Sequence, residues 1–121
     1  MRVFSLAGAM AGLLAVALGA LGSHLLAPGL STGGAALFDT ALRYQMWHGL
    51  ALFALPGLLP VASERWLRAG GWAFITGIVF FSGSLYFHAL TGNRPPLPLA
   101  PAGGLSLLAG WGLVIRALLA R

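Results

Sequence analysis

Most side chains of this sequence that could carry acid–base or ligand chemistry stand within one short stretch, at Asp39, Arg43, Tyr44, Gln45 and His48. On a helix, Asp39 and Arg43 are neighbours on one face, because residues four apart face each other. Tyr44 and His48 are also four apart, on a face turned by roughly 100°. For Asp39 and Arg43 two interpretations stay open: an ion pair that anchors the start of a helix, or a charge pair that lines a cavity.

The three histidines, His24, His48 and His88, raise the hypothesis of a metal or haem site. Their spacing contains neither an HExxH motif nor two histidines four apart, and there is no cysteine. Because a buried imidazole needs a partner, we expect His48 to hydrogen-bond Tyr86 or a nearby serine. A proton- or ligand-handling role for His48 is the alternative. The chain has two acidic residues in total, so we predict no cofactor, no metal and no catalytic residues.

The elements that position these side chains are strongly apolar. Of the residues, 59% are hydrophobic and 7% charged, against about 25% charged in soluble domains, which excludes a water-soluble globule. Each membrane span needs about 20 mostly apolar residues. The chain therefore predicts one four-helix transmembrane domain over 1–121, with spans at about 3–27, 35–59, 66–90 and 98–119. A cleaved signal peptide is the alternative for the first stretch, although its apolar run is longer than such peptides require.

The arginines predict the orientation. Nucleic-acid binding is not expected, because the arginines are scattered and form no basic patch. Under the positive-inside rule, the side with more arginine is cytoplasmic, so both termini are expected there. That side holds Arg2, Arg65, Arg68, Arg116 and Arg121, and the other holds Arg43 and Arg94.

Several polar side chains fall at similar depth in the outer half of these spans. At 1.5 Å per residue, His48 and Ser106 lie ~12 Å below the outer boundary, and Ser82 and Ser84 lie ~6–9 Å below it. Intramembrane polar groups are costly and are usually placed for a reason. We predict a polar layer, structural or ligand-binding, formed by Asp39, Arg43, Tyr44, Gln45, His48, Ser82, Ser84, Tyr86 and Ser106.

Small residues recur on single helix faces, which allows helix backbones to approach closely in lipid. The glycines predicted to pack are Gly8, Gly12, Gly19, Gly77 and Gly110. The first stretch presents such a face over nearly three turns, so we expect part of it to contact another helix closely. The spacing leaves open whether that helix belongs to the same chain or to a second copy.

Three segments resemble successive signatures of the YgdD/YwdK-like family of small bacterial inner-membrane proteins: 19–24 (GALGSH), 44–50 (YQMWHGL) and 81–86 (FSGSLY). The stretches 90–92 and 101–111 fit the fourth segment of that family. The resemblance covers almost the whole chain in the right order. It implies four transmembrane helices and no established biochemical activity.

Together these observations predict an all-α, antiparallel up-down four-helix membrane bundle, N-in and C-in, in the bacterial inner membrane. We expect a non-enzymatic integral membrane protein, in contact with the lipid bilayer and homo-oligomeric. Its outer polar layer is expected to bind a small ligand or lipid, whose identity the residues leave unknown. The alternative is a small oligomeric transporter or channel, against which the nearly all-apolar inner half argues.

Overall fold

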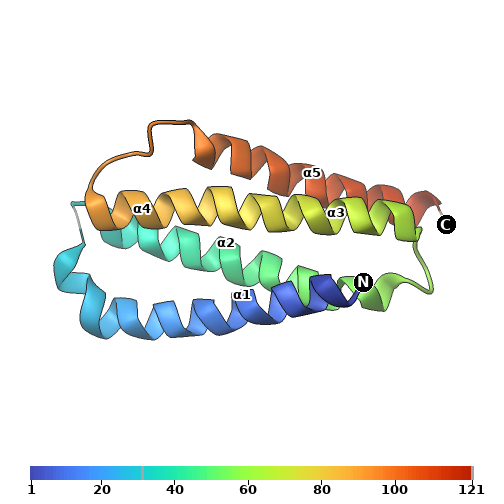
Figure 1. Ribbon diagram of the computed structural model, residues 1–121, viewed down its shortest axis with the longest axis horizontal. Helices are drawn as coiled ribbons and strands as arrows, with labels where there is room; N and C mark the ends of the chain where they lie inside the picture. The colour runs from blue at the N-terminus through green and yellow to red at the C-terminus, as the bar shows by residue number, and fades with distance from the viewer. Residues whose placement is uncertain (31, 121) are drawn as a thin grey trace.

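The computed structural model describes residues 1–30 and 32–120, and in this part of the chain the regular structure is entirely helical. Long helical rods run side by side and alternate in direction, so both termini lie at the same end of the molecule (Figure 1). The third rod is continuous from α3 through a π turn into α4. The helices are α1 (Arg2–Leu21), α2 (Gly34–Ala54), α3 (Glu64–Gly77), α4 (Gly83–Thr91) and α5 (Leu99–Ala120), and the π turn is η4 (Ile78–Ser82).

Glycine and proline residues mark where the rods end. After α1 the chain passes through a π turn, Gly22–Leu26, and a short 3₁₀ turn, Ala27–Gly29. The C-terminal cap of α4 is Gly92 in the left-handed conformation, with φ of 78°, which a residue without Cβ adopts without strain. As a result, the helical stretches begin and end within two residues of the ranges expected from the apolar pattern.

Three of the described helical stretches are long and apolar enough to cross a membrane: Arg2–Gly29, Glu64–Thr91 and Leu99–Ala120. The remaining rod, α2, carries Asp39, Arg43, Gln45 and His48, which lower its apolar character. The fourth span over 35–59 therefore stays a prediction.

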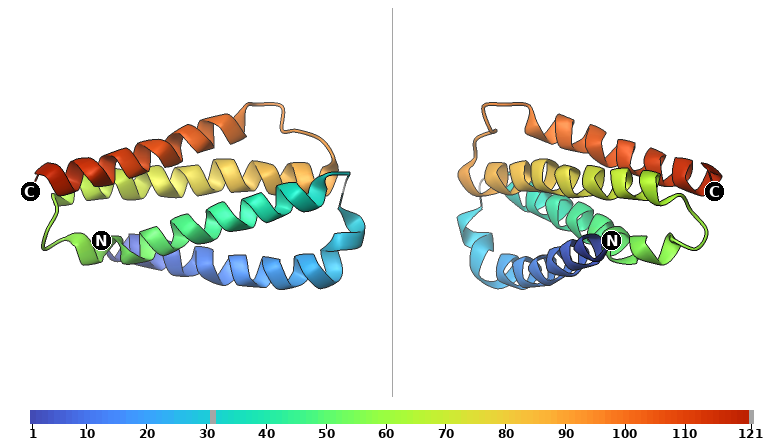
Figure 2. Two further views of the ribbon diagram at one scale, coloured as in Figure 1. Left: turned by 180° about the vertical axis from the view of Figure 1, so that it is seen from behind. Right: turned by 45° about the vertical axis from the view of Figure 1, so that its right-hand side comes forward.

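The rods pack mainly as two close pairs, α1 with α2 and α3 with α5, and α2 joins the pairs through η4 and α4 (Figure 2). At the end near the termini, Phe4 of α1 also lies edge-to-face against Trp72 of α3, with ring centroids 5.4 Å apart. The buried apolar core around Phe4 includes Leu52, Leu67 and Phe74.

Two glycine contacts show how closely the paired helices approach. A Cβ added to Gly49 of α2 would lie 2.9 Å from Ala11 Cβ of α1, and one added to Gly8 would lie 2.9 Å from Phe53 Cα. Such separations are too short for real Cβ atoms. These positions therefore require glycine.

The other glycines predicted to pack divide into two groups. Gly77 and Gly110 lie in the α3–α5 contact, where an added Cβ would come within 2.5 Å of Leu107 Cγ and 2.6 Å of Phe74 Cδ1, respectively. Gly19 faces Leu42 at 3.9 Å, an ordinary van der Waals distance, and Gly12 has nothing within 4 Å. Within the chain, a side chain at Gly12 or Gly19 would therefore have room, although Gly12 N lies 3.6 Å from a Cβ added to Gly49.

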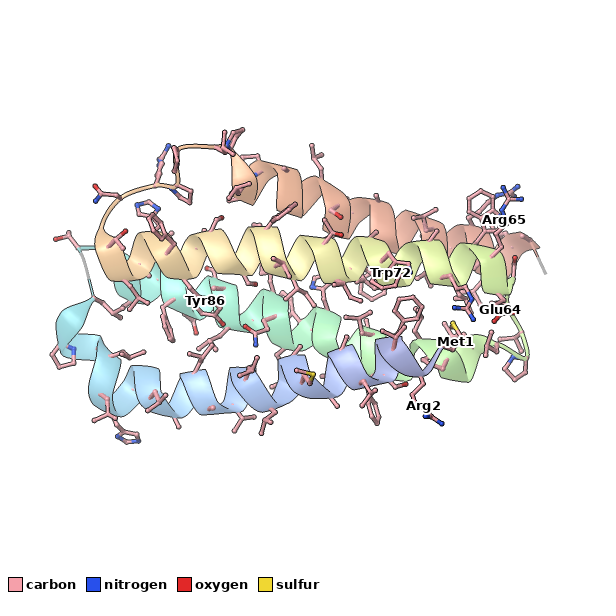
Figure 3. The ribbon with its side chains drawn as sticks, in the orientation of Figure 1. Met1, Arg2, Glu64, Arg65, Trp72 and Tyr86 are labelled. Carbon is pink, nitrogen blue, oxygen red and sulfur yellow. The ribbon has the colours of Figure 1, made fainter. Side chains whose placement is uncertain are left out.

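Charged side chains gather at the end that holds the termini, where Figure 3 places Arg2, Glu64 and Arg65. Arg68 Nη2 donates to Glu64 Oε1 at 3.0 Å. The guanidinium groups of Arg65 and Arg116 lie 5.0 and 5.3 Å from the Trp66 ring centroid. Arg121, which was also expected on this side, lies outside the described residues.

Candidate functional site

Gln45 is the centre of a hydrogen-bond chain that joins three helices. Its Nε2 donates to the Ala11 carbonyl of α1 at 2.8 Å, and its Oε1 accepts from Tyr86 Oη of α4 at 2.7 Å. Gln45 is buried and Tyr86 is partly buried. Figure 3 shows Tyr86 in the half of the molecule away from the termini. Both functional groups of the amide are thus satisfied by neighbouring helices, as burial requires.

Ser82 stands at the last position of the π turn η4 and is buried. Its Oγ donates to the Ala41 carbonyl of α2 at 2.8 Å, so the turn is tied to α2. The extra residue of a π turn shifts the faces that the helix presents on either side of it, and such turns are frequent at functional sites. Here Ile78, Val79 and Ser82 face a cavity beside α1, while Phe81 contacts Tyr44, with ring centroids 4.6 Å apart.

His48 lies on another face of α2 among aromatic rings. Trp111 Nε1 of α5 donates to His48 Nε2 at 3.0 Å, and His48 Nδ1 lies 2.7 Å from the Tyr44 carbonyl. An indole N–H can only donate, so Nε2 accepts and Nδ1 carries the proton and donates to Tyr44. The ring is therefore neutral, with both nitrogens engaged, and offers no lone pair to a metal.

The expectation that His48 bonds Tyr86 or a nearby serine is wrong, since its partner is Trp111. The physical reason is the direction of the face: Tyr44 and His48 point toward Phe74, Phe81 and Trp111, whereas Gln45 points toward Tyr86. The sequence offered one usable signal, because the indole N–H of a tryptophan in an apolar helix can only donate and needs an acceptor.

The remaining polar side chains do not converge on one site. Ser106 Oγ donates to the Ala73 carbonyl at 2.7 Å and so ties α5 to α3, whereas Ser84 Oγ donates within its own rod to the Phe81 carbonyl at 3.2 Å. His48, Ser82, Ser84 and Ser106, which share a depth, thus have separate partners. The structure brings together Gln45, Ser82 and Tyr86, which line one cavity.

Asp39 and Arg43 form an exposed ion pair near the start of α2. Both Nε and Nη2 of Arg43 donate to Asp39 Oδ2, the Nε distance being 3.0 Å. Their side chains are 55% and 60% exposed, respectively. Asp39 also lines a cavity of about 180 Å³ with Phe38 and Leu42. An exposed i,i+4 pair contributes little to stability, so its main consequence is that the two charges neutralise each other.

The cavity beside Gln45 measures about 480 Å³ and lies between α1 on one side and α3, η4 and α4 on the other; we call it the lateral groove. Its walls are apolar apart from the three side chains that carry hydrogen bonds. It is lined by Ala7, Met10, Ala11, Leu14, Leu18, Gln45, Leu52, Ile75, Ile78, Val79, Ser82, Gly83 and Tyr86. The polar atoms of Gln45, Ser82 and Tyr86 are already bonded inside the protein, so the groove suits an apolar ligand.

Among residues 1–30 and 32–120 no group of three or more metal-binding side chains occurs. The acidic side chains, Asp39 and Glu64, are each paired with an arginine four residues on.

Comparison with known proteins identifies the family of this chain. Residues 18–104 match the family described as "Protein of unknown function (DUF423)". The chain is 40% identical over 119 residues to a UPF0382 membrane protein of Staphylococcus epidermidis, covering 98% of this chain and 97% of that one. It is 35% identical to the UPF0382 membrane protein YwdK of Bacillus subtilis, covering 97% and 96% of the two chains.

Identity to the UPF0382 inner membrane protein YgdD of Escherichia coli K12 is also 35%, covering 94% of this chain and 87% of that one. No solved structure matches.

Proposed function

This chain belongs to the DUF423 family and is similar over nearly its whole length to UPF0382 membrane proteins. From this premise we propose that it is a non-enzymatic four-span membrane protein that holds an apolar lipid chain in the lateral groove. The protein resides in the bacterial inner membrane and crosses it more than once. The resemblance to the YgdD/YwdK-like family is confirmed.

The proposal rests on one observation: the wall of the lateral groove is apolar, and its polar side chains already have hydrogen-bond partners inside the protein. Met10, Leu14 and Val79 present hydrocarbon to the groove, and α1 and the α3–α4 rod are candidate membrane spans. A polar substrate would find Gln45 and Tyr86 bonded to each other and would lose its own hydration without replacement. An acyl chain has no polar groups whose hydration would be lost on entering.

The proposal includes α2 as a span, with both termini in the cytoplasm. From Gly34 to Leu58 the rod is continuous through a 3₁₀ turn, Leu55–Leu58. At 1.5 Å per residue that length exceeds the ~30 Å of a bilayer core. Its Gln45 and His48 are buried and bonded to other helices, and its ion pair lies at one end. The arginines near the termini support the N-in, C-in orientation.

A homo-oligomer is a further part of the proposal. Gly12 has open space beside it within the chain. A second copy could approach α1 closely there, because small residues favour helix contacts in lipid.

The test is photolabelling with a phospholipid that carries a photoactivatable acyl chain, followed by mapping of the labelled residues by mass spectrometry. We expect labelling to concentrate at Met10, Leu14 and Val79. Gly83→Leu adds bulk at the groove, where a new Cβ meets nothing within 4 Å, and should strongly reduce that labelling without loss of stability. Gly112→Leu in α5 is the matched control, since its Cβ also meets nothing and it lies outside the groove.

Equal labelling of the exposed α5 residues Leu105, Leu108 and Leu119 would contradict the proposal. The lateral groove would then be ordinary lipid-facing surface.

A further inference from the structure

A second cavity lies at the end of the molecule opposite the termini, under the loop between α4 and α5. It measures about 530 Å³, and we call it the distal pocket. It is lined by Leu37, Ser84, Leu85, His88, Arg94, Pro95, Pro96, Leu97, Pro98, Leu99, Ala100 and Pro101. The candidate spans end at Thr91 and begin again at Leu99, so the pocket lies at the boundary between hydrocarbon and headgroups.

Arg94 is the charged group of this pocket whose charge the chain does not neutralise. The acidic side chains are Asp39 and Glu64, and they pair with Arg43 and Arg68. Within the described ranges Arg94 forms no ion pair. Its charge can therefore be complemented by an anion from outside the protein.

The rest of the pocket lining is mostly apolar, and four of its residues are prolines. Pro95, Pro96, Pro98 and Pro101 fix their backbone φ angles, so the loop loses little conformational freedom when a ligand binds. Leu99 and Ala100 bring the first turn of α5 to the same pocket, which adds partial positive charge.

We infer that the distal pocket binds the headgroup of an anionic phospholipid, with the phosphate at Arg94 and the upper acyl chain against Leu37, Leu85 and Leu97. An anion alone would explain the arginine but not the apolar walls. A zwitterionic phospholipid would also offer a phosphate, but its headgroup cation offsets that charge, so an anionic headgroup complements Arg94 better. This site is separate from the lateral groove and recognises the lipid headgroup rather than the acyl chain.

The experiment measures the lipids that the purified protein retains from nanodiscs containing both phosphatidylglycerol and phosphatidylcholine, by native mass spectrometry. The wild-type protein should retain phosphatidylglycerol preferentially. Arg94→Gln should reduce that preference about fivefold, the effect of one cation near an anionic surface, and Arg94→Lys should restore part of it. Ala100→Phe keeps the charge but fills the pocket, and should also reduce retention.

Arg65→Gln is the matched control. It removes one exposed positive charge, outside any ion pair with an acidic side chain of the described residues, at the other end of the molecule. An equal loss in Arg65→Gln and Arg94→Gln would overturn the inference, because the preference would then reflect overall charge. Binding of inorganic phosphate at Arg94 with no phospholipid retained would also overturn it, by identifying a site for the free ion. Failure of the photolabelling in the lateral groove would leave this headgroup preference unchanged, so the two proposals fail separately.

Discussion

The polar side chains of α2 and its neighbours act one by one as links between helices. Gln45 connects α2 to α1 and α4, and His48 connects α2 to α5. Ser82 of η4 donates a hydrogen bond to α2. No buried side-chain nitrogen or oxygen among the described residues lacks a partner. In lipid an unpaired group would be especially costly, so these side chains specify which helices are neighbours.

The Gln45–Tyr86 bond should show measurable coupling. Tyr86→Phe leaves Gln45 Oε1 without its donor, and Gln45→Leu leaves the Tyr86 hydroxyl without its acceptor, so each should destabilise the protein by about 1–3 kcal/mol. The double variant should be more stable than the sum predicts, by about 0.6–1.7 kcal/mol, the range found for such bonds in membranes. Equilibrium unfolding in mixed micelles of the four proteins measures this coupling.

Strictly additive effects would show that the two side chains do not interact in the membrane. Ser5→Ala, which removes an exposed hydrogen bond from Ser5 Oγ to the Phe53 carbonyl, provides a comparison with little expected loss.

At the scale of elements, glycine decides how closely helices pair. Gly8 and Gly49 bring α1 against α2, and Gly77 and Gly110 bring α3 against α5. The close pairs leave the lateral groove between α1 and the α3–α4 rod, with Gln45 of α2 among its lining residues. The π turn η4 then directs Val79 and Ser82 into the groove and Phe81 toward Tyr44.

Gly8→Leu and Gly12→Leu separate contacts within the chain from contacts between copies. Gly8→Leu should lower the free energy of unfolding by about 1–3 kcal/mol, the usual cost of overpacking. The reason is that its Cβ would overlap the α2 backbone. Gly12→Leu, one turn away, has room within the chain and should leave monomer stability unchanged. If copies associate through this face, Gly12→Leu should lower the oligomer mass measured by analytical ultracentrifugation.

Loss of stability in Gly12→Leu equal to that in Gly8→Leu would contradict the described α1–α2 contact. An unchanged mass would show that the Gly12 face contacts lipid.

Across the whole molecule, charge is distributed unequally between the two ends. Arg2, Arg65, Arg68 and Arg116 lie toward the end that holds the termini, and Arg94 lies in the opposite loop. Between the ends the core consists of apolar residues such as Phe4, Leu52, Leu67 and Phe74.

The proposed topology can be tested with single cysteines, because the chain contains none of its own. Thr32→Cys and Asn93→Cys should react with a membrane-impermeant maleimide added outside intact spheroplasts. Ser63→Cys and Ala120→Cys should react only after the membrane is opened. If α2 did not cross, Thr32→Cys and Ser63→Cys would be labelled from the same side, and the four-span proposal would be wrong.

The residues alone determined the family, the membrane location and the helical ranges. Those features depend on local properties, namely the length of each apolar stretch and the glycines and prolines that end it, which is why the bounds agree within two residues. The polar composition of α2 was equally visible, as was the tendency of Gly8 to pack.

The tertiary structure decided which of these residues meet. Depth along a helix follows from residue number, but the direction of a side chain depends on which helix packs on which face. For that reason His48, Ser82, Ser84 and Ser106 share a depth without sharing a site, and His48 bonds Trp111. For the same reason a Cβ added to Gly12 meets no atom within 4 Å, whereas one added to Gly8 overlaps α2. The lateral groove arises between rods distant in sequence, so no local pattern could have revealed it, and in the distal pocket Leu37 joins residues of the 84–101 stretch.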